Sequence, residues 1–556
     1  MPSEKLKIRF QEIERLSLAA GLEPFDVHFF EVPSPVIWQT AAYGLPTRYS
    51  HWSFGRSYEF QKHQGEMGFS KIYELILNNN PSIAYLDSTN TDTVNLLIAA
   101  HCQGHSSFFR NNIMFIKSGE THMIDVASQH AAIIDQFRND YGDDVVDDWL
   151  DIALSLEQHI DVYKGRHRKK YPGRQISIEH RKVLPWEDLN LKNDPLSVKK
   201  IKGIHIPPCP EKDILWFLSE YANLEDWQKK IFEIVRRESY YFFPAFKTKI
   251  INEGFASYWH AEIMKQYALG DNNDYGVKDI QYPLTDEEHL DFVAYHEKVV
   301  QPGLKIPLKI KTKDATGKDV KVWNPKVNSN IFSAATRLNP YYVGFKIFRD
   351  IKERWDKYYE QGYMENEWGE KINVDINGTE KVLQVAYEND DVSFLRNYLT
   401  DELASELKLF VYGSTKDYND NYDIQENIQK GDYTSQEVKN KTVGVRSKDK
   451  KLAIEAIAKV RNNYGAPNIV IRRIDDNGVM RLEHTTDDDV NLDMKYAEHV
   501  LEYIYKAWRR PIELIRKDKL NNKTRLLIYN GMKFESDFES YEYPEILENN
   551  DIPSSW

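Results

Sequence analysis

Apolar residues recur at intervals of three and four along most of the chain between residues 5 and 411, which is the spacing of an amphipathic helix. The segments with this spacing, which we predict to be helices, are Lys71–Leu77, Thr91–Phe109, Ile124–Phe137, Val145–Val162, Asp226–Tyr241, Lys249–Tyr267, Asp286–Val299, Gly344–Gln361 and Val392–Leu409. Together they predict a large, mainly helical domain.

Two segments interrupt the helical pattern with alternating apolar and polar residues, the spacing of a strand. Leu304–Trp323 alternates around a turn-type sequence, Asp314 to Gly317. Lys371–Gln384 contains Asn377-Gly378, a dipeptide typical of tight hairpin turns. We therefore expect two small β-hairpins inserted into the helical domain.

The pattern changes after residues 413–440, a polar stretch that we interpret as a linker. The order that follows is helix, strand, strand, helix, strand, with a possible leading strand at Thr442–Val445, and it suits a small ferredoxin-like α+β domain. The elements are Lys448–Asn463, Asn468–Ile474, Val479–His484, Asp493–Trp508 and Ile512–Ile515. The predicted class is α+β, divided into residues 1–411, a linker at 412–440, a small domain at 441–530 and a loose acidic tail at 531–556.

Length, charge and cysteine content narrow the class of protein. A chain of 556 residues exceeds the size of a single ordinary core. The net charge of −13 gives no global attraction for nucleic acid. Two cysteines provide no disulfide framework, no long apolar run predicts a membrane span, and residues 1–21 lack the apolar centre of a secretory signal. We expect a cytoplasmic protein that binds no nucleic acid.

Histidine is concentrated in the helical part, where 14 of the 16 histidines precede residue 300. His101 and His105 are four residues apart in a predicted helix, so both imidazoles can face one metal ion. A hydrogen-bonded pair of core histidines explains the same spacing. On spacing alone the structural pair is favoured, and the metal site is the alternative.

A second helix, predicted at Lys249–Tyr267, holds Glu253 and His260 two turns apart on one face. A carboxylate from a separate helix completes many zinc sites that contain two histidines. In His-Glu-x-x-His peptidases the residue after the first histidine is the general base, but here that residue is Cys102. Either another group, such as Glu238, His260 or His296, replaces that base, or the site is not that of a peptidase.

Two further stretches combine aromatic and polar side chains. The first contains His51, Trp52 and Arg56, and the second contains Asn339 and Tyr342 at the predicted start of a helix. Packing and helix capping explain both stretches, with Asn339 as the N-cap. Lining of a substrate pocket is the alternative interpretation, and on it these five residues would bind substrate.

Five motifs in this order resemble the stage V sporulation protein R (SpoVR) family. They are Tyr49–Gly55, Ala100–Asn112, Arg237–Pro244, Thr248–His260 and Asn339–Phe345. The resemblance implies a cytosolic protein that is linked, in spore formers, to the spore cortex and its peptidoglycan. It also implies two partners, a serine-kinase-like AAA+ ATPase and a von Willebrand-type protein. This chain departs from the family pattern in having three residues, not four, between the two histidines.

Two hypotheses follow. In the first, His101, His105 and Glu253 bind a divalent metal, zinc before iron or manganese, in an enzyme that hydrolyses or transfers an amide of a peptide or peptidoglycan-derived substrate. His260, His296 and Glu238 would then move protons. In the second, the same residues are structural and the protein is a non-catalytic assembly or regulatory factor that works with those partners.

Overall fold

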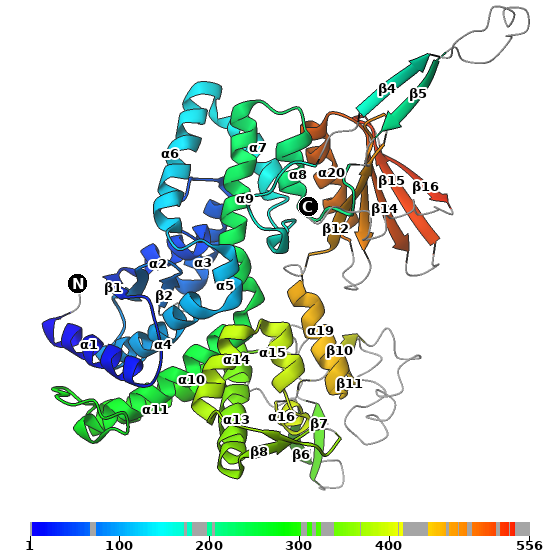
Figure 1. Ribbon diagram of the computed structural model, residues 1–556. Coiled ribbons are helices and arrows are strands. Elements are labelled where there is room, and N and C mark those ends of the chain that lie inside the picture. Colours follow the sequence, from blue (N-terminus) through cyan, green and yellow to red (C-terminus); the bar gives the residue numbers. More distant parts are fainter. Residues whose placement is uncertain are drawn as a thin grey trace, which may run out of the picture. The chain divides into compact units, whose positions relative to one another are not determined.

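The computed structural model of the protein divides into two compact units, and two helices, α6 and α9, run from one unit into the other (Figure 1). The first unit comprises residues 1–131 and 241–462, and the second comprises residues 132–240 and 463–556. The structure describes residues 3–66, 74–171, 175–180, 197–202, 206–301, 309–313, 319–323, 338–366, 368–407, 409, 411–414, 443–462, 466–475, 477–485, 492–518, 523–532 and 534–539.

The first unit is mainly helical. Its helices are α1 (Glu4–Ala19), α2 (Ser34–Tyr43), α3 (Trp52–Glu66), α4 (Asp92–Asn111), α5 (Ile113–Ser118), α10 (Lys249–Ala268), α11 (Asp286–Val299), α13 (Pro340–Gln361), α14 (Gly378–Glu388), α15 (Asp391–Tyr398), α16 (Asp401–Glu406) and α19 (Lys450–Asn462), with the start of α6 (Met123–Tyr141) and the end of α9 (Asp226–Lys247). Most of the predicted helices are confirmed; Val392–Leu409 forms two, because Thr400 caps a new helix with its side chain.

Helix α10 is the centre of this unit and packs along both α4 and α13. Two contacts bring the helix backbones together. A Cβ atom on Gly104 of α4 would lie 2.8 Å from the Cα atom of Ala256, and one on Gly254 would lie 2.3 Å from the Cα atom of Gly344 in α13. These distances leave no room for a side chain, so the small residues of α10 fix how closely the three helices approach.

Side chains fix where the three central helices begin. Thr91 caps α4 by accepting a hydrogen bond from the Val94 amide, and Asn339 caps α13. Helix α10 has no side-chain cap of its own. Asp391 of α15 supplies it, because its Oδ1 atom accepts hydrogen bonds from the amides of Ile250 and Ile251 at 2.8 and 2.9 Å.

A three-stranded sheet with the order β1-β3-β2 packs beside α4. Strands β1 (Val27–Val32) and β3 (Ser82–Asp87) are parallel, and β2 (Glu74–Leu77) is antiparallel to β3. The predicted helix at Lys71–Leu77 is therefore wrong for its described part. A short apolar run does not distinguish strand from helix by its spacing, and pairing with β3 decided it.

One of the two predicted hairpins is confirmed. Strands β6 (Lys309–Lys313) and β7 (Asp319–Trp323) are antiparallel, and the residues between them lie outside the described part. The hairpin at Lys371–Gln384 is wrong, because β9 (Lys371–Asn373) pairs with the preceding β8 (Tyr363–Glu365). Asn377 caps α14 in a capping box with Glu380, so this Asn-Gly begins a helix.

The second unit combines helices with a five-stranded sheet. Its helices are α7 (Asp143–Leu154), α8 (Ile214–Tyr221), α20 (Met494–Trp508) and most of α6 and α9. Its sheet has the order β12-β13-β14-β15-β16, formed by Asn468–Ile474, Met480–Thr485, Ile512–Asp518, Lys523–Tyr529 and Phe534–Glu539. Strands β13 and β14, which flank α20 in sequence, are parallel, and the other neighbours are antiparallel. A separate hairpin pairs β4 (Gln175–His180) with β5 (Ser197–Lys202).

The α+β class dominated by helices is confirmed, while the predicted details of the C-terminal part need correction. Helix α19 packs against α15 in the first unit, and β11 (Val443–Ser447) pairs there with β10 (Val411–Ser414). The sheet instead gains β15 and β16, so it does not have the predicted ferredoxin-like set of elements. Most of the predicted linker and the tail beyond residue 539 lie outside the described residues.

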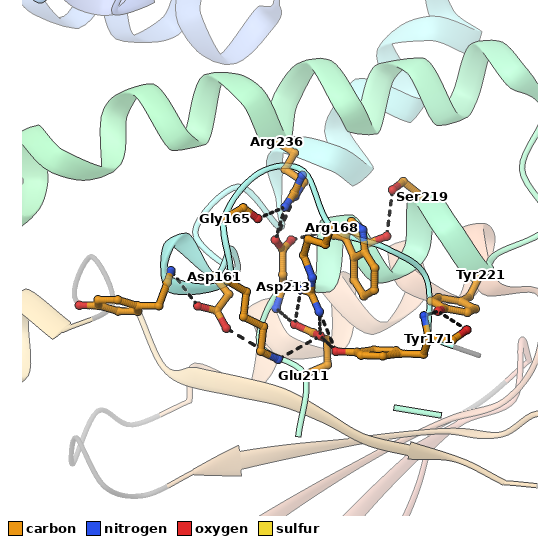
Figure 2. A network of polar contacts seen from close by, with 12 residues as sticks. Asp161, Gly165, Arg168, Tyr171, Glu211, Asp213, Ser219, Tyr221 and Arg236 are labelled. Atoms are coloured by element: carbon orange, nitrogen blue, oxygen red, sulfur yellow. Dashed lines mark hydrogen bonds and ion pairs between the residues drawn. The ribbon is translucent and has the colours of Figure 1, made fainter. Parts of the chain in front are cut away.

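A buried polar network holds the segment before α8 in the second unit, and Figure 2 shows its members converging. Glu211, which is fully buried, pairs with Arg168 at 2.6 Å and with Lys164 at 3.3 Å, and also accepts a hydrogen bond from Tyr171. Asp213 next to it caps α8 and pairs with Arg236. Two basic residues of the run 164–170, Lys164 and Arg168, therefore form ion pairs inside the protein.

No described helix combines the length and the apolar character that crossing a bilayer requires.

We predict that Gly254→Ala destabilises the protein strongly. The new methyl group would collide with the backbone of α13 at Gly344, and overpacking of this kind costs about 3 kcal/mol. Urea unfolding followed by circular dichroism measures the effect. Gly55→Ala in α3 is the matched control, because nothing lies within 4 Å of its Cβ position, and it should stabilise slightly. Equal effects of the two substitutions would contradict the packing argument.

Candidate metal centre

Helix α4 presents two imidazoles on one face. His101 and His105 lie one helical turn apart, with their ring centroids 4.5 Å apart and their planes perpendicular. Both side chains are buried. The three-residue spacing of this chain, shorter than the family pattern, therefore suits a regular helix with both histidines on the same side.

Glu253 of α10 faces this histidine pair. Its Oε2 atom lies 3.5 Å from Nε2 of His101 and 3.3 Å from Nε2 of His105. The three groups are the only set of described histidine, cysteine and acidic side chains whose ligand atoms gather this way, all within 4.8 Å of one another. About 3.3 Å separates two ligands of a tetrahedral zinc ion, so the donor atoms have the spacing of a zinc site.

Hydrogen bonding leaves the atoms that face one another without partners. Nδ1 of His105 lies 2.9 Å from Oδ1 of Asn252, an acceptor, so Nδ1 carries a proton and Nε2 is the ring nitrogen directed at Glu253. Nε2 of His101 and Oε2 of Glu253 are buried and form no hydrogen bond in the described structure. Buried polar atoms without partners are costly, and a cation placed between these two would remove that cost, so the arrangement can accept a metal ion.

The carboxylate of Glu253 is kept ionised. Burial opposes its charge, but Lys249 and the two histidines outweigh burial and hold the pKa of the Glu253 carboxyl well below its usual range. Nζ of Lys249 lies 2.5 Å from Oε1, one turn earlier on α10. One oxygen is thus neutralised by lysine, and the other remains directed at the histidines.

A chain of histidines leads away from the cluster. Nδ1 of His101 lies 3.0 Å from Nδ1 of His260 on α10, and Nε2 of His260 lies 2.7 Å from Nδ1 of His296 on α11. Burial and the neighbouring histidine lower the pKa of His101 to about 4, and burial lowers that of His296 to about 4 as well. Burial, His101 and His296 hold the pKa of His260 well below its usual value. All three are therefore neutral at pH 7.

Two aromatic rings enclose the pair. Tyr341 at the start of α13 stacks on His101 with centroids 6.0 Å apart, and Phe109 stacks on His105 with centroids 5.9 Å apart. Burial and the charge of Glu253 raise the pKa of the Tyr341 phenol well above its usual range. The phenol therefore stays protonated beside the carboxylate.

Glu74 is a neighbour of the cluster that sequence reasoning missed. It lies on β2, and burial together with the charge of Glu253 raises the pKa of its carboxyl to about 7. The segment was predicted as a helix, and nothing in its local sequence indicates that pairing with β3 brings it near α10. Asn252 and Lys249 were also missed, although both belong to the Thr248–His260 motif.

The remaining candidates have different surroundings. Glu238 lies on α9 in the second unit and is fully buried, whereas the histidine cluster belongs to the first. Cys102 is buried, and burial together with Glu74 and Glu253 raises the pKa of its thiol well above its usual value. A thiol in that state is a poor nucleophile.

The proposed substrate-binding residues occupy helix starts. His51 is buried, and its Nδ1 atom lies 2.7 Å from the hydroxyl of Ser53. Trp52 and Arg56 are exposed on α3. Asn339 caps α13, and its amide nitrogen also donates to the carbonyl oxygens of Val299 and Gln301. Tyr342, partly buried, lies under the ammonium of Lys346. Capping and packing account for Asn339; a role in binding substrate stays a prediction for all five residues.

We predict that the metal-free protein loses stability on acidification. The pKa values of His101, His260 and His296 are lowered in the folded state, so between pH 6.5 and about 4 the unfolded chain binds protons that the folded chain does not. Each histidine should cost about 1.4 kcal/mol per pH unit in that window. Thermal unfolding in EDTA at pH 7.5 and 5.0 measures this loss.

The variant His296→Gln should reduce the pH dependence by one proton, because the lowered pKa of His296 no longer contributes. A melting temperature that is the same at both pH values would contradict the prediction.

Comparison with known proteins covers most of the chain. The family described as "SpoVR like protein" matches residues 2–447, a range that includes the whole histidine cluster and ends before β12. Uncharacterized protein YcgB of Escherichia coli (strain K12) is 27% identical over 427 residues, which are 73% of this chain and 74% of YcgB. No solved structure matches. Because the family match extends over well more than half of the sequence, this chain belongs to the SpoVR-like family.

Proposed function

We propose that the first unit is a metal-dependent enzyme that hydrolyses or transfers an amide bond of a peptide or peptidoglycan-derived substrate. One observation carries the proposal: Nε2 of His101 and Oε2 of Glu253 are buried, face each other at 3.5 Å and have no hydrogen-bond partner in the described structure. Keeping such atoms desolvated is costly, and a bound cation would remove that cost.

His101, His105 and Glu253 would hold the ion, with Zn²⁺ first and iron or manganese next, since two imidazoles and one carboxylate form a common catalytic zinc set. A divalent cation held there would polarise an amide carbonyl and lower the pKa of a water molecule. Asn252 fixes the tautomer of His105 that leaves Nε2 available, and Lys249 holds the second oxygen of Glu253.

Proton transfer is assigned to groups around this centre. Glu74, with a carboxyl pKa raised to about 7, is suited to accept a proton at neutral pH and would replace the glutamate that Cys102 displaces. His260 and His296 form a hydrogen-bonded path from His101 to α11. Since each neutral imidazole both donates and accepts, the path can carry a proton outward.

Family membership supports the biological setting of the proposal. The family name implies sporulation, and the resemblance links the spore-forming members to cortex peptidoglycan, whose cross-links contain amides. A serine-kinase-like AAA+ ATPase and a von Willebrand-type protein are the partners that we propose. The alternative is a non-catalytic assembly factor that works with the same partners, and Cys102 in place of the usual general base favours it.

We predict that the protein, purified without a histidine tag, binds close to one equivalent of zinc, measured by mass spectrometry of the metal and by titration calorimetry. The double variant His101→Ala/Glu253→Ala should lose the zinc, because two of three ligands are removed. His63→Ala is the control for histidine content and should keep it. A folded wild-type protein that takes up no zinc, iron or manganese would refute the metal site.

We further predict that Asn252→Leu weakens zinc binding by about 10- to 100-fold, because His105 loses the acceptor that fixes its tautomer.

The variant Glu74→Gln should leave zinc binding within about threefold and reduce hydrolysis of peptidoglycan-derived peptides at least 100-fold. Zinc binding without any amide turnover in the wild type would favour the assembly role.

A further inference from the structure

The second unit contains a cavity of about 260 Å³. One wall is α20, a second is the face of strands β12, β13 and β14, and a third is the segment 154–159 that follows α7. Most lining side chains are apolar, among them Leu156, Ile469, Leu482, Ala497 and Leu501. The cavity is formed entirely within this unit, so it is independent of the metal centre.

His159 provides an uncommitted polar group in this apolar lining. Its backbone carbonyl accepts a hydrogen bond from the amide of Ile214 at 3.1 Å, which fixes its position. The side chain is partly buried, and its Nδ1 atom is buried and forms no hydrogen bond with the residues that the structure describes. Burial and Lys212 lower the pKa of the ring to about 4, so the imidazole is neutral and offers one donor and one acceptor.

The wall that contains His159 is held in place by the buried network of Figure 2. Ion pairs of Glu211 with Lys164 and Arg168 fasten the chain that continues from His159. Glu211 also exchanges two backbone hydrogen bonds with Ile471 of β12, at 2.9 and 2.8 Å. The cavity is therefore lined by a braced segment and a sheet, as in a preformed ligand site.

The charged side chains among the lining residues, Glu157 and Asp493, are both acidic. Asp493 already accepts hydrogen bonds from the amides of Lys495 and Tyr496 as the N-cap of α20. An anionic ligand would find no cationic side chain among the described lining residues. A neutral ligand does not need one.

We propose that this cavity binds a neutral, mainly apolar small molecule that has one hydroxyl or amide group hydrogen-bonded to His159. A cavity of about 150 Å³ accommodates benzene, so this one fits a ligand of about ten non-hydrogen atoms. The ligand fills the space between α20 and the sheet, and its polar group satisfies the imidazole.

Equilibrium dialysis of the full chain against 2-naphthol tests the proposal, with naphthalene as the matched probe that lacks the hydroxyl. We expect one equivalent of 2-naphthol to bind with a Kd on the order of 100 µM. Val500→Trp, which fills the cavity from α20, should abolish binding of both probes. His159→Phe should weaken 2-naphthol about fivefold and leave naphthalene unchanged, because only the hydroxyl loses its partner.

Circular dichroism verifies that each variant folds, and Ala497→Leu replaces Val500→Trp as the filling variant if the tryptophan prevents folding. Absence of saturable binding, or binding that both filling variants leave intact, would overturn the cavity as a ligand site. A loss of affinity in His159→Phe that is equal for the two probes would overturn the hydrogen bond to the ligand.

Discussion

The backbone contacts of α10 with its two neighbours are the constraint on which the first unit depends. At Gly104 and Ala256 the helix approaches α4, and at Gly254 and Gly344 it approaches α13, both times too closely for a Cβ atom. This approach buries Glu253 against the two histidines of α4 and places Tyr341 of α13 over one of them. Wider spacing between these helices would admit water to the histidines and Glu253, and it would remove the burial that shifts their pKa values.

Burial has two opposite electrostatic consequences at this centre. Histidines are kept neutral, because a desolvated imidazolium is costly and its neighbours are also imidazoles. Glu253 is kept charged, because Lys249 offers one ammonium at the edge of the site. Nε2 of His101 and Oε2 of Glu253 therefore lack the hydrogen bonds that a structural core pair would make, which is the basis of the proposed metal site.

The second unit also buries acidic side chains, but it surrounds them with different partners. Glu211 and Asp213 are also fully buried acids, but Arg168, Lys164 and Arg236 neutralise them completely with direct ion pairs (Figure 2). These ion pairs brace the segment that precedes α8. His159 is different, because its Nδ1 atom is buried without a hydrogen-bond partner among the described residues, while its backbone carbonyl is held by Ile214.

The sequence by itself determined the features that depend on one helix or one turn. The spacing of His101 and His105 put both on one face of α4, and the N-cap Asn339 marked where a helix begins, because these effects act within four residues. Only the tertiary structure decided which helix α10 would touch, that Glu74 lies on a strand near Glu253, and that α19 belongs to the first unit. Those outcomes depend on contacts between separate elements of the chain, and a short apolar run or an Asn-Gly pair carries no record of them.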